Sequence, residues 1–220
     1  MKKIKNLLTI LLAVIIVCNT SMTAFASTTS TPNTASETNS NVVVTDTGIY
    51  VNCTYYSQEQ FIELLDTAQK IETPQTYSTI ALVAGTWMIP GVGEVVITAA
   101  GTVIIAGAIV TAGSWAYNAV VDWFATRAFN KSAEDAVNNC NSNKQNHIMN
   151  PKHNWNKFKK NPKWSDISPI LIKVLKDGHE TWEKNDQYIR TLVYKGKTVV
   201  VRFIKNSDGL VKYISTAWCN

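Results

Sequence analysis

The alternation of apolar and polar positions is clearest near the C-terminus, where it predicts one helix followed by four strands. Ser165-Asp166 has the composition of a helix N-cap, and Gly178 stands where a left-handed C-cap is common. Between them, apolar residues recur at helical spacing: Ile167, Ile170, Leu171, Val174 and Leu175. Strand-like runs separated by hairpin-length turns follow at His179–Lys184, Tyr188–Tyr194, Thr198–Lys205 and Val211–Trp218. The pattern predicts an α+β C-terminal module over residues 144–220, with one or two helices packed on a four-stranded antiparallel sheet.

Strand parity in this module separates an apolar face from one that carries polar groups. In the third strand the alternation places Arg202 on the face opposite Phe203. An arginine in mid-strand is out of place in a core, so Arg202 either lies on an open face or meets an anion. In the fourth strand, the same rule puts Ile214, Thr216 and Trp218 on one face.

The pattern before this module predicts a mostly helical domain over residues 42–140. Val42 to Tyr56 alternates loosely and is β-like, and Ser57 with Gln60 three positions later is typical of a capped helix that ends near Pro74. Residues 78–124 then carry only two charges. A turn at residues 90–93 divides this stretch, and the glycines after the turn suit close helix contact, so we expect a hydrophobic helical hairpin.

The expected hairpin leaves three alternatives open. Its second half, residues 95–121, is uncharged for 27 residues, which is long enough to cross a membrane. The hairpin is therefore a membrane anchor, a soluble core, or a segment that inserts into a target membrane only under some conditions. We weight the last two equally and the permanent anchor less.

The composition of the first 41 residues predicts an export signal followed by a linker. Three lysines precede the apolar run Leu7 to Val17, and Ala24-Phe25-Ala26 has the small-x-small pattern of a cleavage site. We expect residues 1–26 to be a secretory signal peptide cut after Ala26, and the protein to be secreted. Residues 27–41 are almost wholly Ser, Thr and Asn, a composition typical of a flexible linker.

Charge divides the chain into an acidic and a basic part. Residues 144–220 carry 15 Lys and Arg against 6 Asp and Glu, whereas residues 45–143 carry 3 against 9. The net charge of the whole chain is +5. A basic module joined to an acidic one indicates an anionic partner for the basic part.

The residues that can perform chemistry gather in H-I-M-N-P-K-H-N-W, residues 147–155. His147, His153 and Lys152 bring two imidazoles and a cation into nine residues, a set suited to proton transfer beside an anion. Two histidines six residues apart, with no carboxylate or cysteine at ligand spacing, make a poor zinc site, and we predict neither a metal nor a cofactor. There is also no phosphate-binding glycine loop and no serine nucleophile elbow.

The order of these segments resembles a known toxin family. The histidine stretch, W-S-D-I-S from Trp164, the helix ending at Gly178 and the closing I-S-T-A-W at residues 214–218 are similar to polymorphic toxin type 35. This family is placed in the barnase/EndoU/colicin/RelE-like superfamily of ribonuclease toxins. The resemblance covers about residues 144–219. Such modules share a fold of helices followed by a four-stranded antiparallel sheet.

The resemblance implies a secreted bacterial toxin that cleaves RNA without a metal and is neutralised by a cognate immunity protein. It points to His147, Lys152, His153 and Thr216 as catalytic positions, and Arg202 would add a cation beside the reacting phosphate. Trp155 and Ser215 are expected to contact the substrate, Trp155 by stacking on a base. Which histidine is the acid and which the base stays open.

Two other functions fit the same residues. A secreted basic module can bind an anionic polymer without turnover, and the hydrophobic hairpin can permeabilise or transiently contact a membrane. Three cysteines remain after the signal peptide, at positions 53, 140 and 219, so at most one intramolecular disulfide can form. We prefer a Cys53–Cys140 bridge.

Overall fold

The computed structural model describes residues 42–71, 85–98 and 100–220. The predicted signal peptide and linker, residues 1–26 and 27–41, therefore lie outside the described residues. The same is true of residues 78–84, where the predicted hairpin begins.

Three short strands open the described chain, and one helix follows them. β1 (Val42–Val44), β2 (Gly48–Val51) and β3 (Thr54–Ser57) form an antiparallel sheet. The Ser57 side chain accepts from the backbone N–H of Gln60, and the Gln60 side chain accepts from the N–H of Ser57. This capping box starts α2 (Gln58–Asp66) at the residue that the sequence predicts.

The predicted helical hairpin is wrong, because its described residues up to Val110 form a sheet. Five antiparallel strands follow one another in chain order: β4 (Gln69–Lys70), β5 (Gly85–Ile89), β6 (Gly93–Ile97), β7 (Val103–Ile105) and β8 (Ala108–Val110). Among the described residues, no helix is both long enough and apolar enough to cross a membrane. The N-terminal part is therefore mainly β-structure.

Local sequence explains why these residues form strands. Val95, Val103 and Ile105 are fully buried, and β-branched side chains pack well on a pleated surface. Gly101 and Gly107 have φ values of 79° and 82°, which only glycine adopts freely. These two glycines therefore serve the turns that begin and end β7, and they do not line a contact between helices.

A long helix leads from this part into the C-terminal module. α3 (Trp115–Asn138) starts at the N-cap Ser114, and its early residues Ala116 and Val120 pack in the N-terminal core. Its later residues Ala133 and Val137 pack in the core of the C-terminal module. Three short elements follow, α4 (Ser142–Ile148) and the 3₁₀ turns η1 (Pro151–His153) and η2 (Trp155–Lys157).

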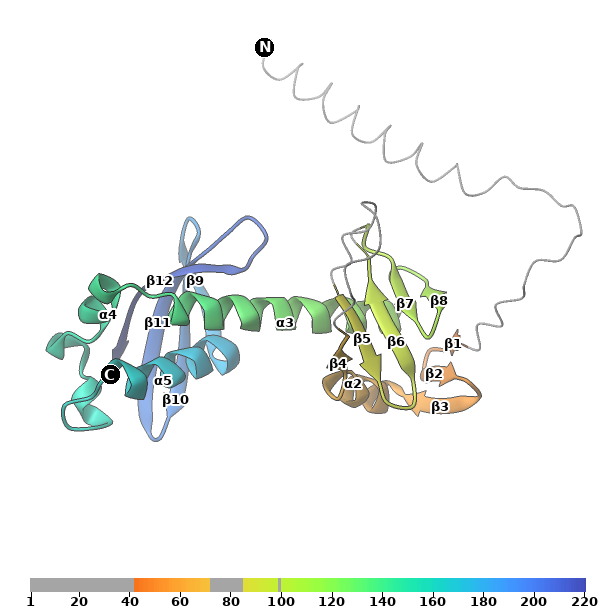
Figure 1. The fold of residues 1–220 in the computed structure, drawn as a ribbon, viewed down its shortest axis with the longest axis horizontal. Helices are drawn as coiled ribbons and strands as arrows, with labels where there is room; N and C mark the ends of the chain where they lie inside the picture. The colour runs from red at the N-terminus through yellow and green to blue at the C-terminus, as the bar shows by residue number, and fades with distance from the viewer. Residues whose placement is uncertain (1–41, 72–84, 99) are drawn as a thin grey trace, which may run out of the picture. The chain divides into compact units, whose positions relative to one another are not determined.

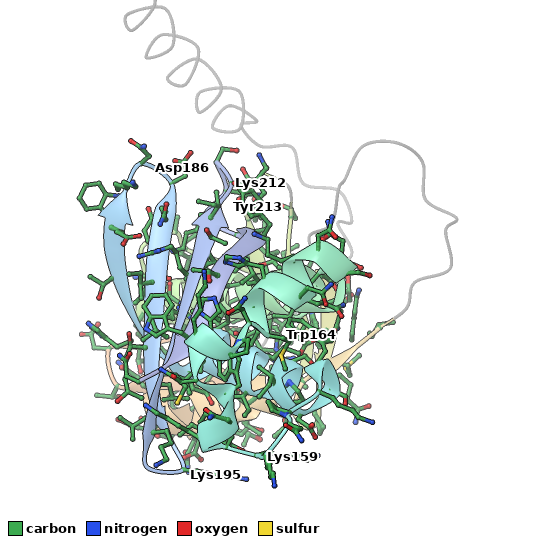
Figure 2. The ribbon with its side chains drawn as sticks, turned by 90° about the vertical axis from the view of Figure 1, so that its left-hand side faces the viewer. Lys159, Trp164, Asp186, Lys195, Lys212 and Tyr213 are labelled. Carbon is green, nitrogen blue, oxygen red and sulfur yellow. The ribbon has the colours of Figure 1, made fainter. Side chains whose placement is uncertain are left out.

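The C-terminal sheet has the predicted architecture. Its strands are β9 (His179–Lys184), β10 (Gln187–Tyr194), β11 (Lys197–Lys205) and β12 (Val211–Cys219), and each boundary lies within one residue of the prediction. They are antiparallel in the order β12-β11-β10-β9, so β12 is an edge strand. Helix α5 (Trp164–Asp177) packs across one face (Figure 1). Figure 2 shows the module from one end, with its helices to one side of the strands.

The ends of α5 differ in detail from the prediction. The N-cap is Lys163 and not Ser165, so the helix starts two residues earlier, and the Lys163 backbone N–H donates to the Asp166 carboxylate at 2.8 Å. Gly178 has an extended backbone, with φ of −76°, and it is not a left-handed cap. A Cβ at Gly178 would lie 2.4 Å from the carbonyl oxygen of Val174, so the close approach of backbones requires glycine there.

Candidate active site

His147 lies over the edge of the sheet, next to a hydroxyl on β12. The Asn141 side chain caps α4 by accepting from the backbone N–H of Lys144, and the fully buried Ile148 anchors the helix in the core. These contacts leave His147 exposed, with its Nε2 3.2 Å from the Oγ1 of Thr216. Two sequence-predicted positions 69 residues apart thus form one hydrogen-bonded pair.

His153 completes the histidine pair from the neighbouring turn. Pro151 occupies the first turn of η1, and Asn154 ends that turn in a left-handed conformation with φ of 61°. The His153 ring centroid lies 5.4 Å from that of His147. Only 8% of His153 is exposed, and its buried Nε2 has no hydrogen-bond partner within the protein.

The surroundings of His153 lower its pKa. Burial has the largest effect, because it disfavours the charged imidazolium, and the charges of His147 and Lys152 act in the same direction. Lys152, the residue before His153 in η1, is exposed to solvent. These surroundings favour the neutral form of the His153 imidazole.

The lowered pKa of His153 predicts a dependence of stability on pH. Below pH 6.5, the ordinary histidine value, the unfolded chain binds a proton that folded His153 still rejects. The free energy of unfolding should therefore rise with pH from the lowered pKa to about 6.5 and show no further contribution from His153 above that. Urea unfolding between pH 4.5 and 8 measures this. In His153→Gln the rise should be smaller, and an equal slope in both proteins would contradict the assignment.

A β-bulge decides which side chains of β12 reach this site. Ile214 and Ala217 are both buried in the core, although simple alternation places them on opposite faces. The register shifts where β12 passes Arg202 and Phe203 of β11, and Ser215 is the extra residue. The predicted shared face is therefore wrong for Ile214, whereas Thr216 and Trp218, which pair with Arg202 and Val200, do share one. The bulge turns Thr216 away from the core and towards His147.

Lys144 contacts the bulge from α4. Its Nζ donates to the carbonyl oxygen of Ser215 at 2.9 Å. This bond connects α4 to the bulge in β12. Ser215 was predicted to contact substrate, and the structure places it beside Thr216 as the residue that forms the bulge.

Arg202 lies beside Thr216 and forms an ion pair with Glu183. The sequence pattern did not predict this carboxylate as part of the site. Arg202 and Thr216 are paired residues on β11 and β12. The Arg202 Nη2 donates to Glu183 at 2.6 Å, and its guanidinium lies 5.4 Å from the ring centroid of Trp218. Arg202 therefore meets an anion of the protein itself. Along β9, Glu183 follows His179 and Thr181 at every second position. This alternation is the sequence signal that could have identified Glu183.

Trp155 does not have the predicted role. It is 2% exposed, and its Nε1 donates to the carbonyl oxygen of Ile148 at 2.7 Å within the core. A side chain buried in this way cannot stack on a nucleic-acid base. Trp155 instead fixes the turn that carries His153 to the end of α4.

The cysteines do not form the predicted bridge. Cys53, Cys140 and Cys219 are all free thiols. Cys53 is exposed, whereas Cys140 packs against the C-terminal core, where burial raises the pKa of its thiol. Within residues 42–71, 85–98 and 100–220, no group of three or more His, Cys, Asp and Glu side chains is arranged to hold a metal ion.

Comparison with known proteins shows that the C-terminal module is similar to a family of bacterial toxins. Residues 140–219 match the family model described as Bacterial toxin 35. The match covers α4, both 3₁₀ turns, α5 and the four-stranded sheet, and it confirms the resemblance to polymorphic toxin type 35. No curated protein and no solved structure matches the chain.

Proposed function

We propose that the C-terminal module is a toxin domain that cleaves RNA by metal-independent acid–base catalysis. The observation that carries the proposal is the pair of histidines, 5.4 Å apart, beside the hydroxyl of Thr216 on a basic module. RNA suits this arrangement because it supplies its own nucleophile, the 2′-hydroxyl, next to the phosphate. Attack by this hydroxyl expels the 5′-oxygen and leaves a 2′,3′-cyclic phosphate.

The environments of the two histidines suggest a division of roles. Burial lowers the pKa of His153 and so favours the neutral imidazole, which can accept the proton of the 2′-hydroxyl. His147 is exposed and bonded to Thr216, so it is the member placed to donate a proton to the leaving 5′-oxygen. Lys152 and Arg202 supply positive charge for the phosphorane, and Glu183 holds Arg202 in place.

The two rival functions have less support. A module that only binds an anionic polymer requires lysines, but binding alone does not require two imidazoles beside a hydroxyl. The membrane-active alternative depended on a helical hairpin, and the described residues between 85 and 110 form strands joined by turns. We further propose that residues 1–26 direct export and that a cognate immunity protein covers the histidine pair in the producing cell.

Producing residues 42–220 in the bacterial cytoplasm tests the proposal. Growth should stop and total RNA should lose integrity within the first hour of induction. A matched culture producing His153→Gln, at equal soluble yield, should keep its RNA intact. Equal toxicity of both proteins, or growth arrest with undamaged RNA, would count against a ribonuclease.

A further inference from the structure

Two segments of the C-terminal module are rich in lysine and contain no carboxylate. Residues 150–165 and residues 193–199 have no Asp or Glu. Five exposed lysines from these segments form what we term the lysine rim: Lys157, Lys159, Lys160, Lys195 and Lys197. At the other end of the same strands, lysines alternate with acidic residues. Figure 2 shows Lys159 and Lys195 at one end of the module and Asp186 and Lys212 at the opposite end.

Packing holds the two lysine segments together. The ring of Phe158, just after η2, lies 6.0 Å from the ring of Tyr194 at the end of β10. Asn154 donates to the carbonyl oxygen of Cys219, which is the last residue of β12. Val199, two residues after Lys197, is paired with Cys219 on β12, and the backbone N–H of Asn220 donates to the carbonyl oxygen of Thr198 at 2.9 Å.

The rim adjoins the histidine pair along β12. Thr216 beside His147 and Cys219 beside the rim are three residues apart on one strand, a distance of roughly 10 Å. The turn that carries His153 continues through Asn154 directly into η2 and Lys157. A flexible oligonucleotide bound at the histidines therefore needs only a few nucleotides to reach the rim.

Most of the rim's charge is not neutralised by the protein. Among the described residues, Lys159 alone of the five forms an ion pair, at 2.8 Å from Asp166. The charges of the other four lysines are therefore not balanced by an ion pair within the part of the chain that the structure describes. Exposed like charges gathered in this way are typical of surfaces that bind a polyanion.

We propose that the lysine rim binds the phosphates of single-stranded RNA next to the scissile phosphate. The identity of the polymer rests on the proposed function. The rim sets affinity for RNA that extends beyond the cleaved bond, whereas the histidine pair performs the reaction. A single strand suits the site because its backbone can bend from the edge of β12 around the turn between β10 and β11.

Salt-dependent binding of a 12-nucleotide single-stranded RNA tests the rim. The full chain carries His147→Ala, so that the RNA stays intact, and binding is measured between 50 and 300 mM KCl. Each lost phosphate contact lowers the slope of log K against log salt by about 0.7. Lys195→Gln/Lys197→Gln should lower the slope by about 1.4 and the affinity at 150 mM KCl by about tenfold. Lys157→Gln/Lys160→Gln should act likewise.

Lys184→Gln/Lys212→Gln is the matched control, because it removes the same charge from the opposite end of the sheet. It should leave slope and affinity close to those of the His147→Ala parent. Equal losses in control and rim variants would mean that only net charge matters, and unchanged slopes in the rim variants would overturn the proposal. If the rim variants behave as expected but the wild-type protein does not cut RNA, the rim stands as a binding surface and the ribonuclease proposal falls.

Discussion

His147→Ala and His153→Ala should each lower kcat/KM for RNA cleavage by about 10²–10⁴-fold, the usual effect of removing a general acid or base. Both rings lie beside the hydroxyl-bearing edge of β12, and the chain offers no other imidazole at this edge. The rate should be measured on a short fluorogenic RNA under single-turnover conditions. His153→Gln repeats the test with less loss of volume, because His153 is buried.

Thr216→Val separates a role in the site from a role in the strand. Valine keeps the β-branched shape but removes the hydroxyl that meets His147 at 3.2 Å. The rate should fall, by less than in the histidine variants, while the unfolding curve stays in place. Full activity in both histidine variants, with the wild type active, would contradict the assigned mechanism.

Trp155→Ala should destabilise the C-terminal module by about 3–5 kcal/mol, as is usual for a buried aromatic residue. The substitution leaves a large cavity beneath the turn of His153. It also removes the indole N–H that donates to the carbonyl oxygen of Ile148. Urea unfolding followed by circular dichroism measures the loss.

Two further variants serve as comparisons for Trp155→Ala. Trp182→Ala is the matched control, since Trp182 is 62% exposed, and it should change the free energy of unfolding by about 0.5 kcal/mol or less. Trp155→Phe should lose an intermediate amount. If Trp155→Ala instead kept full stability and lost RNA affinity, the tryptophan would be a stacking platform, as the sequence first indicated.

The C-terminal fold could be predicted from sequence because each local signal agrees with its neighbours. The apolar period of α5, the glycine that follows it and the short turns between strands all favour one arrangement. The N-terminal part could not be predicted in this way. Strands such as β6 and β7 are nearly continuous apolar runs, which periodicity alone does not distinguish from buried helix.

The candidate site shows a similar limit. His147, His153 and Lys152 are close in sequence, so a local motif suffices to find them. Glu183 and Lys144 act through partners on other elements, and the bulge at Ser215 adds one residue to the register. Since one extra residue reverses the faces of a strand, parity gave the correct open face for Arg202 but wrongly placed Ile214 on the face of Thr216.

The products of RNA cleavage in excess chelator test the central claim most directly. Purified protein is incubated with single-stranded RNA in EDTA, and the ends of the fragments are identified by mass spectrometry. The mechanism predicts an undiminished rate and fragments that end in a 2′,3′-cyclic phosphate. Loss of cleavage in chelator, or fragments carrying 5′-phosphates and free 3′-hydroxyls, would contradict it.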